Sequence, residues 1–279
     1  MRNENKNKGL TVVELLVVLA VMALLVSLLL PAVTMVINLA KTTKQKAQFA
    51  TISIALETFR NDFGDYPESD NLANDYCGAQ KLSEAMVGYD LFGVHPNTEF
   101  KSDGKWTTGP TPQEYTATDA ANLKARKGPY IEVEKAGAVK LDALYSNPSP
   151  LTAATYVLTD TFKKKNVQSP DKKFGMPILY YKAKVNKIEH AQGASDNIYD
   201  FDNNKALCYT LTAPWDGAPT TVLNDTQFYG DDYIANKNTD NPAASSTYLP
   251  YNKDSFILIS AGKDGLYGTD DDIFNFDKE

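Results

Sequence analysis

Apolar residues are distributed unevenly along the chain. Nine mostly polar residues come first, and from Leu10 to about Ile37 the chain is almost continuously apolar, with no polar side chain from Leu15 to Val26. A helix of roughly 28 residues is about 42 Å long, which exceeds the ~30 Å hydrocarbon core of a bilayer. The pattern therefore predicts one membrane-spanning helix near the N-terminus.

The helical pattern continues beyond this span. Apolar residues recur at alternating spacings of 3 and 4, at Phe49, Ile52, Leu56, Phe59 and Phe63. This spacing is typical of an amphipathic helix that packs against an apolar surface. Together the two patterns predict one helix from Leu10 to Asp62, kinked or loosened at Pro31, which lacks a backbone donor. Gly64 and Pro67 are expected to end it.

The segment 68–170 is polar and rich in Thr, Asp, Gly and Pro. Short helices are predicted at Gln80–Val87 and Asp119–Lys127. No repeat is visible, and we expect this segment to form partly ordered surface.

Strand-like runs occur later at Ile178–Val185, Ala206–Leu211 and Phe256–Ser260, separated by Asp-Gly, Asn-Asn and Gly-Asp turns. Three such strands predict a small antiparallel sheet whose apolar face receives the helix. The expected fold class is therefore α+β.

Composition narrows the range of functions. The chain has 28 Lys+Arg against 35 Asp+Glu, a net charge of −7, which argues against a nucleic-acid partner. Two cysteines are too few for a disulfide scaffold or a Cys-rich zinc site, and two histidines supply few groups for a His-based metal or acid–base centre. Cys77 and Cys208 form either one disulfide or two separate buried thiols.

Enzyme motifs are incomplete or missing. Ser169–Lys172 and Ser195–Asn197 match two of the three penicillin-recognising motifs, but the third, Lys-Thr-Gly, is absent. No phosphate-binding loop, zinc-protease motif or dinucleotide fingerprint is present. The sequence therefore predicts no catalytic residues and a protein that is not an enzyme.

Glu14 places a carboxylate inside the apolar run. Such a charge at the centre of a membrane helix costs about 2.5–3.5 kcal/mol, so it is usually functional and paired. A cut after Gly9 would make Leu10 the first residue and create a positive amine. That amine on a neighbouring copy is a suitable partner for Glu14. A secretory signal peptide and an uncleaved signal anchor are the alternatives, although no good signal-peptidase site comes after the apolar run.

The residues from Lys8 to Leu19, Lys-Gly-Leu-Thr-Val-Val-Glu-Leu-Leu-Val-Val-Leu, resemble the class III signal of type IV pilins and type II secretion pseudopilins. The resemblance implies that a prepilin peptidase cuts after Gly9 and methylates Leu10, where the family most often has Phe. It also implies a role for Glu14 in subunit assembly. The Gly-Asp-Tyr-Pro turn at 64–67 and the turn at 171–180 are similar to turns of major pseudopilins.

An acidic stretch near the C-terminus carries Asp264, Asp270, Asp271 and Asp272 among three glycines. Ca²⁺ takes about 6–8 oxygen ligands and tolerates irregular geometry, so these residues are candidate metal ligands. A solvated acidic loop is the alternative. The resemblance implies a calcium loop in which Asp264, Asp271 and Asp272 match the family's ligands and Asp270 is an additional acid. The stretch 200–204 starts like a calcium loop but is interpreted as a turn.

The predicted domains are a leader at 1–9, a transmembrane and filament-core helix at 10–37, its amphipathic continuation and closing turn at 38–67, a variable insertion at 68–170, and the sheet with the calcium loop at 171–279. The resemblance implies a pseudopilin that polymerises with itself into a periplasmic filament for type II protein secretion. Its expected partners are the prepilin peptidase, the inner-membrane secretion platform and minor pseudopilins.

The expected location is the inner membrane, with a cytoplasmic N-terminus and the bulk of the chain in the periplasm. Lysines and arginines are balanced on the two sides of the span, so the family signal decides the orientation. A type IV pilus subunit, and a signal-anchored binding or enzymatic domain, are the alternative functions.

Overall fold

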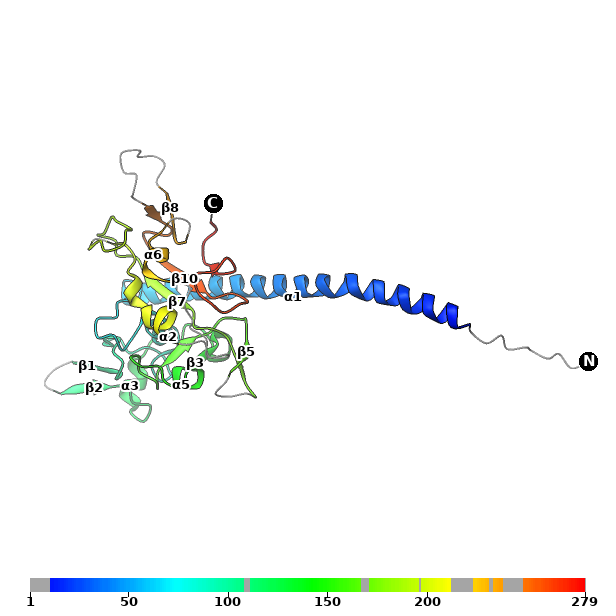
Figure 1. The fold of residues 1–279 in the computed structure, drawn as a ribbon. Helices are drawn as coiled ribbons and strands as arrows, with labels where there is room; N and C mark the ends of the chain where they lie inside the picture. The colour runs from blue at the N-terminus through cyan, green and yellow to red at the C-terminus, as the bar shows by residue number, and fades with distance from the viewer. Residues whose placement is uncertain are drawn as a thin grey trace, which may run out of the picture. The chain divides into compact units, whose positions relative to one another are not determined.

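The computed structural model describes residues 11–107, 111–166, 171–195, 197–211, 223–230, 233–237 and 248–278 (Figure 1). The α+β prediction is confirmed. The chain divides into two compact units, Met1–Thr43 and Lys44–Glu279.

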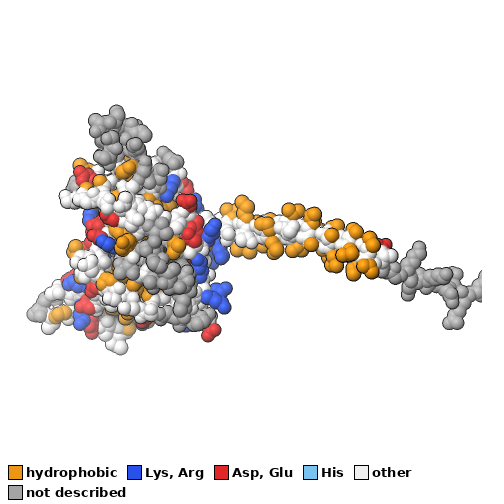
Figure 2. All heavy atoms as spheres, viewed as in Figure 1, with side chains coloured by type: hydrophobic (Ala, Val, Ile, Leu, Met, Phe, Trp, Pro, Cys, Tyr) orange, Lys and Arg blue, Asp and Glu red, His pale blue; other side chains and the backbone are white. Residues whose placement is uncertain are grey.

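The predicted long helix is present as α1 (Val12–Phe63), and it is helical through Pro31. Its end matches the expectation, since Gly64 has φ +89° and donates its N–H to the carbonyl of Arg60 at 2.7 Å. In the first unit every side chain from position 11 to position 37 is exposed. Figure 2 shows apolar side chains along this half of α1. These side chains have no partner among the described residues, so this half of α1 needs an apolar environment outside the single chain.

The second unit buries the predicted apolar stripe of α1. Its core residues are Phe49, Ile52, Ala55, Leu56 and Phe59, joined by the buried Gln45. They share one apolar cluster with Tyr180, Leu258 and Ile273 of the sheet. The prediction that the helix packs on a sheet is therefore confirmed.

That sheet has the order β11-β10-β7 and is antiparallel: β7 (Leu179–Lys182), β10 (Phe256–Ser260) and β11 (Ile273–Phe274). Leu258 lies opposite Tyr180, and Ser260 lies opposite Ile273. Alternation along β10 sends Leu258 toward α1, whereas Ile257 and Ile259 belong to a second apolar cluster. The sheet is buried on both faces.

The prediction of a strand at 206–211 is wrong. Residues Ala206–Thr210 form one π-helical turn, η2, and the third strand is the two-residue β11. Asn204 explains this turn, because its carbonyl accepts the N–H groups of Leu207 and Cys208 at 2.9 and 3.2 Å. Its side chain also donates to the Tyr180 carbonyl at 2.7 Å, which attaches the turn to β7.

The expectation that 68–170 forms surface is also wrong for much of this segment. Helix α2 (Gly78–Val87), close to the predicted Gln80–Val87, is buried at every position. Gly78 permits its close approach to the sheet, because a Cβ there would lie 2.3 Å from the Tyr180 carbonyl oxygen. The segment thus supplies core, including Leu82, Met86 and Val157.

The remaining elements are short. The helices are α3 (Ala120–Ala125), α4 (Val133–Ala136), α5 (Leu141–Leu144), η1 (Phe201–Asn203) and α6 (Asp225–Phe228). Four antiparallel strand pairs are β1 (Lys105–Thr107) with β2 (Pro112–Glu114), β3 (Ala138–Lys140) with β4 (Tyr156–Leu158), β5 (Lys164–Lys165) with β6 (Lys173–Phe174), and β8 (Ala235–Lys237) with β9 (Tyr248–Pro250).

Candidate functional site

Glu14 lies in the first turn of α1, where it forms a reciprocal cap with Thr11. Its Oε2 accepts the Thr11 N–H and the Thr11 hydroxyl, both at 2.9 Å, and its own N–H donates to Thr11 Oγ1 at 3.3 Å. This is a capping box, in which two helix-end donors are satisfied together. The signal was present in the sequence as Thr-x-x-Glu and was missed. Glu14 therefore has a local role in starting α1, besides the predicted one between copies.

The residues of the predicted cleavage site, Gly9 and Leu10, lie outside the described residues. The helix after them, α1, is long and apolar enough to cross a membrane, and its most apolar stretch is wholly exposed. The cap at Thr11 and Glu14 starts this helix directly after the predicted cleavage site. A cut after Gly9 would thus leave a short terminus ahead of an intact helix.

The loop between β10 and β11 contains all four predicted metal-binding aspartates. Asp271 organises it, since its Oδ2 accepts the N–H groups of Lys263 and Asp264 at 2.7 and 2.9 Å, and its Oδ1 accepts the Thr269 hydroxyl at 2.7 Å. Burial acts against ionisation of Asp271, but these hydrogen bonds prevail and lower its pKa. Asp264 in turn accepts the Leu266 N–H at 2.8 Å.

Asp272 has a different environment from the other three. Its Oδ2 accepts the Tyr233 hydroxyl at 2.7 Å and the Gly268 N–H at 2.6 Å, whereas its Oδ1 is buried and has no hydrogen-bond partner among the described residues. Burial raises the pKa of Asp272 to about 7, and the charges of Asp271 and Asp264 act in the same direction. Tyr233 was not foreseen from the sequence, because it lies 39 residues away along the chain.

The aspartates of the β10–β11 loop meet some, but not all, of the requirements of a site for a hard cation. Asp264 and Asp271 interact directly, and burial together with the charge of Asp271 raises the pKa of Asp264. A cation beside the buried Asp272 Oδ1 would satisfy that oxygen and relieve the repulsion. Within the described residues, however, no three His, Cys, Asp or Glu side chains are grouped closely enough to hold one metal. Backbone carbonyls would have to supply further ligands. Asp270 is exposed.

Both cysteines are free and buried. Burial raises the pKa of Cys77 to about 12 and also raises that of Cys208, so neither is a reactive thiolate at neutral pH. The interpretation of 200–204 as a turn is confirmed, because η1 occupies 201–203 and the Asp200 side chain accepts the Asp202 N–H at 3.1 Å.

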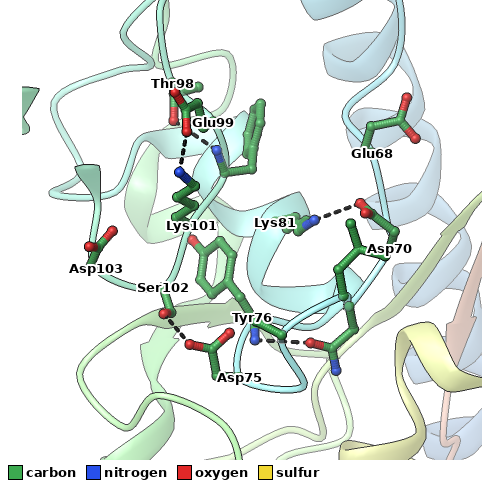
Figure 3. Close-up of a pocket in the computed structure, with 14 residues that line it drawn as sticks. Glu68, Asp70, Asp75, Tyr76, Lys81, Thr98, Glu99, Lys101, Ser102 and Asp103 are labelled. Atoms are coloured by element: carbon green, nitrogen blue, oxygen red, sulfur yellow. Dashed lines mark hydrogen bonds and ion pairs between the residues drawn. The ribbon is translucent and has the colours of Figure 1, made fainter. Parts of the chain in front are cut away.

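A pocket of about 670 Å³ lies between the 68–76 loop, α2 and the 98–103 loop (Figure 3). Its lining is acidic, but several of the carboxylates are engaged. Lys81 pairs with Asp70 at 2.7 Å, Ser102 donates to Asp75 at 2.5 Å, and Lys101 pairs with Glu99. The pocket therefore holds polar contacts that stabilise these loops.

Comparison with known protein families gives a match at the N-terminus. Residues 5–30 match the prokaryotic N-terminal methylation motif. No curated protein and no solved structure matches the chain. The matched residues include Gly9, Leu10 and Glu14, and they run into the exposed apolar half of α1. The chain thus carries a prepilin-type processing signal on an apolar helix, which implies a membrane-anchored, extracytoplasmic protein with a type IV pilin-like N-terminus.

Proposed function

We propose that this protein is a structural subunit of a type II secretion pseudopilus. It is held in the inner membrane, cut after Gly9, methylated at Leu10 and then assembled into a periplasmic filament. The observation that carries the proposal is the exposed apolar half of α1 directly after a methylation motif. Such a helix is stable in a bilayer, and outside it only when other apolar side chains cover it.

Filament assembly supplies that cover. Identical helices packed side by side replace lipid with neighbouring side chains, and a head-to-tail contact between identical subunits generates a helical filament. Glu14 sets the register by pairing with the new amine of Leu10 on the adjacent copy, since a charge in an apolar core is tolerable only when paired. The subunit acts through packing and has no catalytic role.

Three features support a pseudopilin over a surface pilin. The closing turn at 64–67 resembles that of major pseudopilins, and Gly64 adopts the positive φ that such a turn needs. The C-terminal region contains an acidic loop between β10 and β11, and both cysteines are free, whereas a surface pilin usually closes this region with a disulfide. The partners are then other copies of the chain, the prepilin peptidase, minor pseudopilins and the inner-membrane secretion platform.

Calcium is part of this proposal. Asp264, Asp271 and Asp272 would hold Ca²⁺ in the β10–β11 loop. The Oδ1 of Asp272, which has no hydrogen-bond partner among the described residues, supports this assignment. The ion would neutralise the mutual repulsion of these carboxylates and fix the loop beside β11.

Mass spectrometry of the mature chain tests processing. In cells with an active prepilin peptidase we expect the chain to begin at a methylated Leu10, while a Gly9→Val variant keeps Met1. Recovery of the intact chain from peptidase-positive cells would contradict the proposal and favour a signal-anchored domain.

Loss of the gene tests the system to which the subunit belongs. We expect folded secretion substrates to accumulate in the periplasm while surface pili persist. Loss of surface pili with normal secretion would identify a pilus subunit instead.

A further inference from the structure

Four exposed lysines of the second unit lie around α1 and the β5–β6 hairpin: Lys44, Lys163, Lys165 and Lys173. We call these four residues the basic patch. No carboxylate among the described residues pairs with them. Figure 2 shows Lys and Arg side chains gathered on the side of this unit where its first α1 residues lie. On a chain with net charge −7, such a local excess of positive charge runs against the average composition.

Hydrogen bonds fix the basic patch to the first turns of α1 in this unit. The Thr161 N–H donates to Gln45 Oε1 at 2.8 Å, and Gln48 Nε2 donates to the Thr159 carbonyl at 3.0 Å. These bonds hold the chain just before β5 against α1. A pocket of about 440 Å³ results, which both Lys44 and Lys163 line. Lys44 of the helix and Lys163, which comes just before β5, therefore share one surface, and β5 continues from it to Lys165.

The hairpin concentrates charge at a cost to its own stability. Lys165 lies directly opposite Lys173 in the β5–β6 pair, and like charges at such positions destabilise a sheet. Lys164, the neighbour of Lys165 in β5, is half-buried and donates to the Asp264 carbonyl at 2.5 Å. Alternation along β5 therefore leaves Lys163 and Lys165 on the side away from this contact. An anionic surface would relieve the repulsion.

The position of Lys44 in the chain indicates which anionic surface is near. The apolar run ends near Ile37, and seven residues of helix advance about 10 Å. The polar headgroup layer is roughly 5–7 Å thick on each side of the hydrocarbon core, and electrostatic attraction reaches about 8 Å further in physiological salt. Lys44 therefore lies within reach of the lipid headgroups whenever α1 spans a bilayer.

We propose that the basic patch binds anionic lipid headgroups of the bilayer that holds the chain's own helix. This interaction would keep the second unit against the membrane surface until the subunit is extracted into a filament. The proposal rests on the membrane-held precursor of the proposed function, and it goes beyond it by assigning a lipid-binding surface to residues outside the apolar helix.

Lysine labelling of the full-length chain in nanodiscs tests the proposal. One set of discs contains phosphatidylcholine alone and the other contains added phosphatidylglycerol, and acetylation of each lysine is followed by mass spectrometry. We expect labelling of Lys163, Lys165 and Lys173 to slow about fivefold in the anionic discs. The attraction of one lysine to such a surface corresponds to a change in affinity of this size. High salt should abolish the difference.

Lys253 is the internal control. It lies three residues before Phe256, whose ring centroid is 5.0 Å from that of Tyr66, beyond the C-terminal end of α1. Its labelling should be the same in both kinds of disc. The double variant K165E/K173E should lose the protection of Lys163, whereas the matched variant K253E should keep it.

Equal labelling of the basic patch in the two kinds of disc would overturn the proposal. Protection by a soluble acidic protein in neutral discs, without protection by phosphatidylglycerol, would also overturn it and indicate a protein partner. Because nanodiscs hold single subunits, none of these results depends on filament assembly. Failure of the chain to enter discs at all would instead contradict the membrane-held state of the proposed function.

Discussion

Tyr233 donates its hydroxyl to one oxygen of Asp272 at 2.7 Å, while the other oxygen of that carboxylate is buried without a partner among the described residues. Leaving a buried acceptor unsatisfied costs about 1–3 kcal/mol, and more when the group is charged. The contact therefore holds the Asp272 carboxylate in a position that is unfavourable for its ionised form, and this is the observation behind the proposed calcium site.

Calcium should stabilise the fragment Lys44–Glu279, because it binds the folded loop and not the unfolded chain. At a free calcium concentration of 100 times the dissociation constant, the unfolding free energy should increase by about 2.7 kcal/mol. The melting temperature should be higher in calcium than in chelator, and magnesium should give less because it prefers tight octahedral geometry. Asp272→Asn should remove most of the calcium effect.

Asp270→Asn is the matched control, since Asp270 is exposed in the same loop. It also removes one carboxylate from the loop and should keep the calcium effect. Equal losses in the two variants would indicate general screening of an acidic loop. The same melting temperature in calcium, magnesium and chelator would contradict calcium binding.

Asp160 should make the metal-free fragment less stable as pH rises. Burial raises the pKa of Asp160 to about 7 from an unfolded value of 3.8, although Ser260 and the Phe162 N–H hydrogen-bond to it. Below pH 3.8 both states are protonated, and between pH 4 and 7 the folded state retains a proton that the unfolded state has lost. Stability from this group is therefore present in acid and lost as pH rises through about 7.

Asp160→Asn should remove this dependence, because an amide oxygen can still accept the backbone bonds. Urea unfolding in chelator should therefore show that, relative to the native fragment, the variant gains about 4 kcal/mol of unfolding free energy between about pH 4 and 8. Parallel pH profiles for the two proteins would show that Asp160 does not titrate with a raised pKa.

Two substitutions separate the local and intermolecular roles of Glu14. Glu14→Gln keeps an acceptor for the Thr11 N–H but removes the charge, and Glu14→Ala removes both. Both variants should insert into the membrane, and insertion should improve because a charge is lost. If Glu14 sets register by charge pairing, both should fail to form filaments by electron microscopy. Filaments from Glu14→Gln but not from Glu14→Ala would assign the residue to capping alone.

Leu56 should matter far more to the second unit than its neighbour Ile54. Leu56 is 0% exposed in the cluster between α1 and the sheet, whereas Ile54 is 70% exposed. Leu56→Ala should lower the unfolding free energy of the fragment by about 2–5 kcal/mol. Ile54→Ala should change it by less than about 1 kcal/mol. Similar effects of the two changes would contradict the packing of α1 on the sheet.

The parts of the fold that depend on local pattern could be predicted. The span, the stripe from Phe49 to Phe63 and the end at Gly64 result from helical periodicity and from one residue suited to positive φ. β7 and β10 were also found, because each is an apolar run bounded by turn residues. The Thr-x-x-Glu cap was available in the sequence in the same way and was overlooked.

Contacts between distant segments decided the rest. The run at 206–211 has the composition of a strand, yet Asn204 joins it to β7 and α2 as a helical turn, through its bonds to the Tyr180 carbonyl and the Ala79 N–H. β11 has only two residues, which is too few to show a strand periodicity. It is a strand because it pairs with the edge of β10.

The same division holds for the candidate site. The sequence by itself determined the processing signal, the exposed helix and the acidic composition of the C-terminal loop, since these are properties of neighbouring residues. Only the tertiary structure showed that Tyr233 hydrogen-bonds to Asp272, that Asp270 is exposed, and that the chain leading into the β5–β6 hairpin is bonded to α1. Those arrangements depend on which segments share a core, and burial is set by the whole fold and not by local propensity.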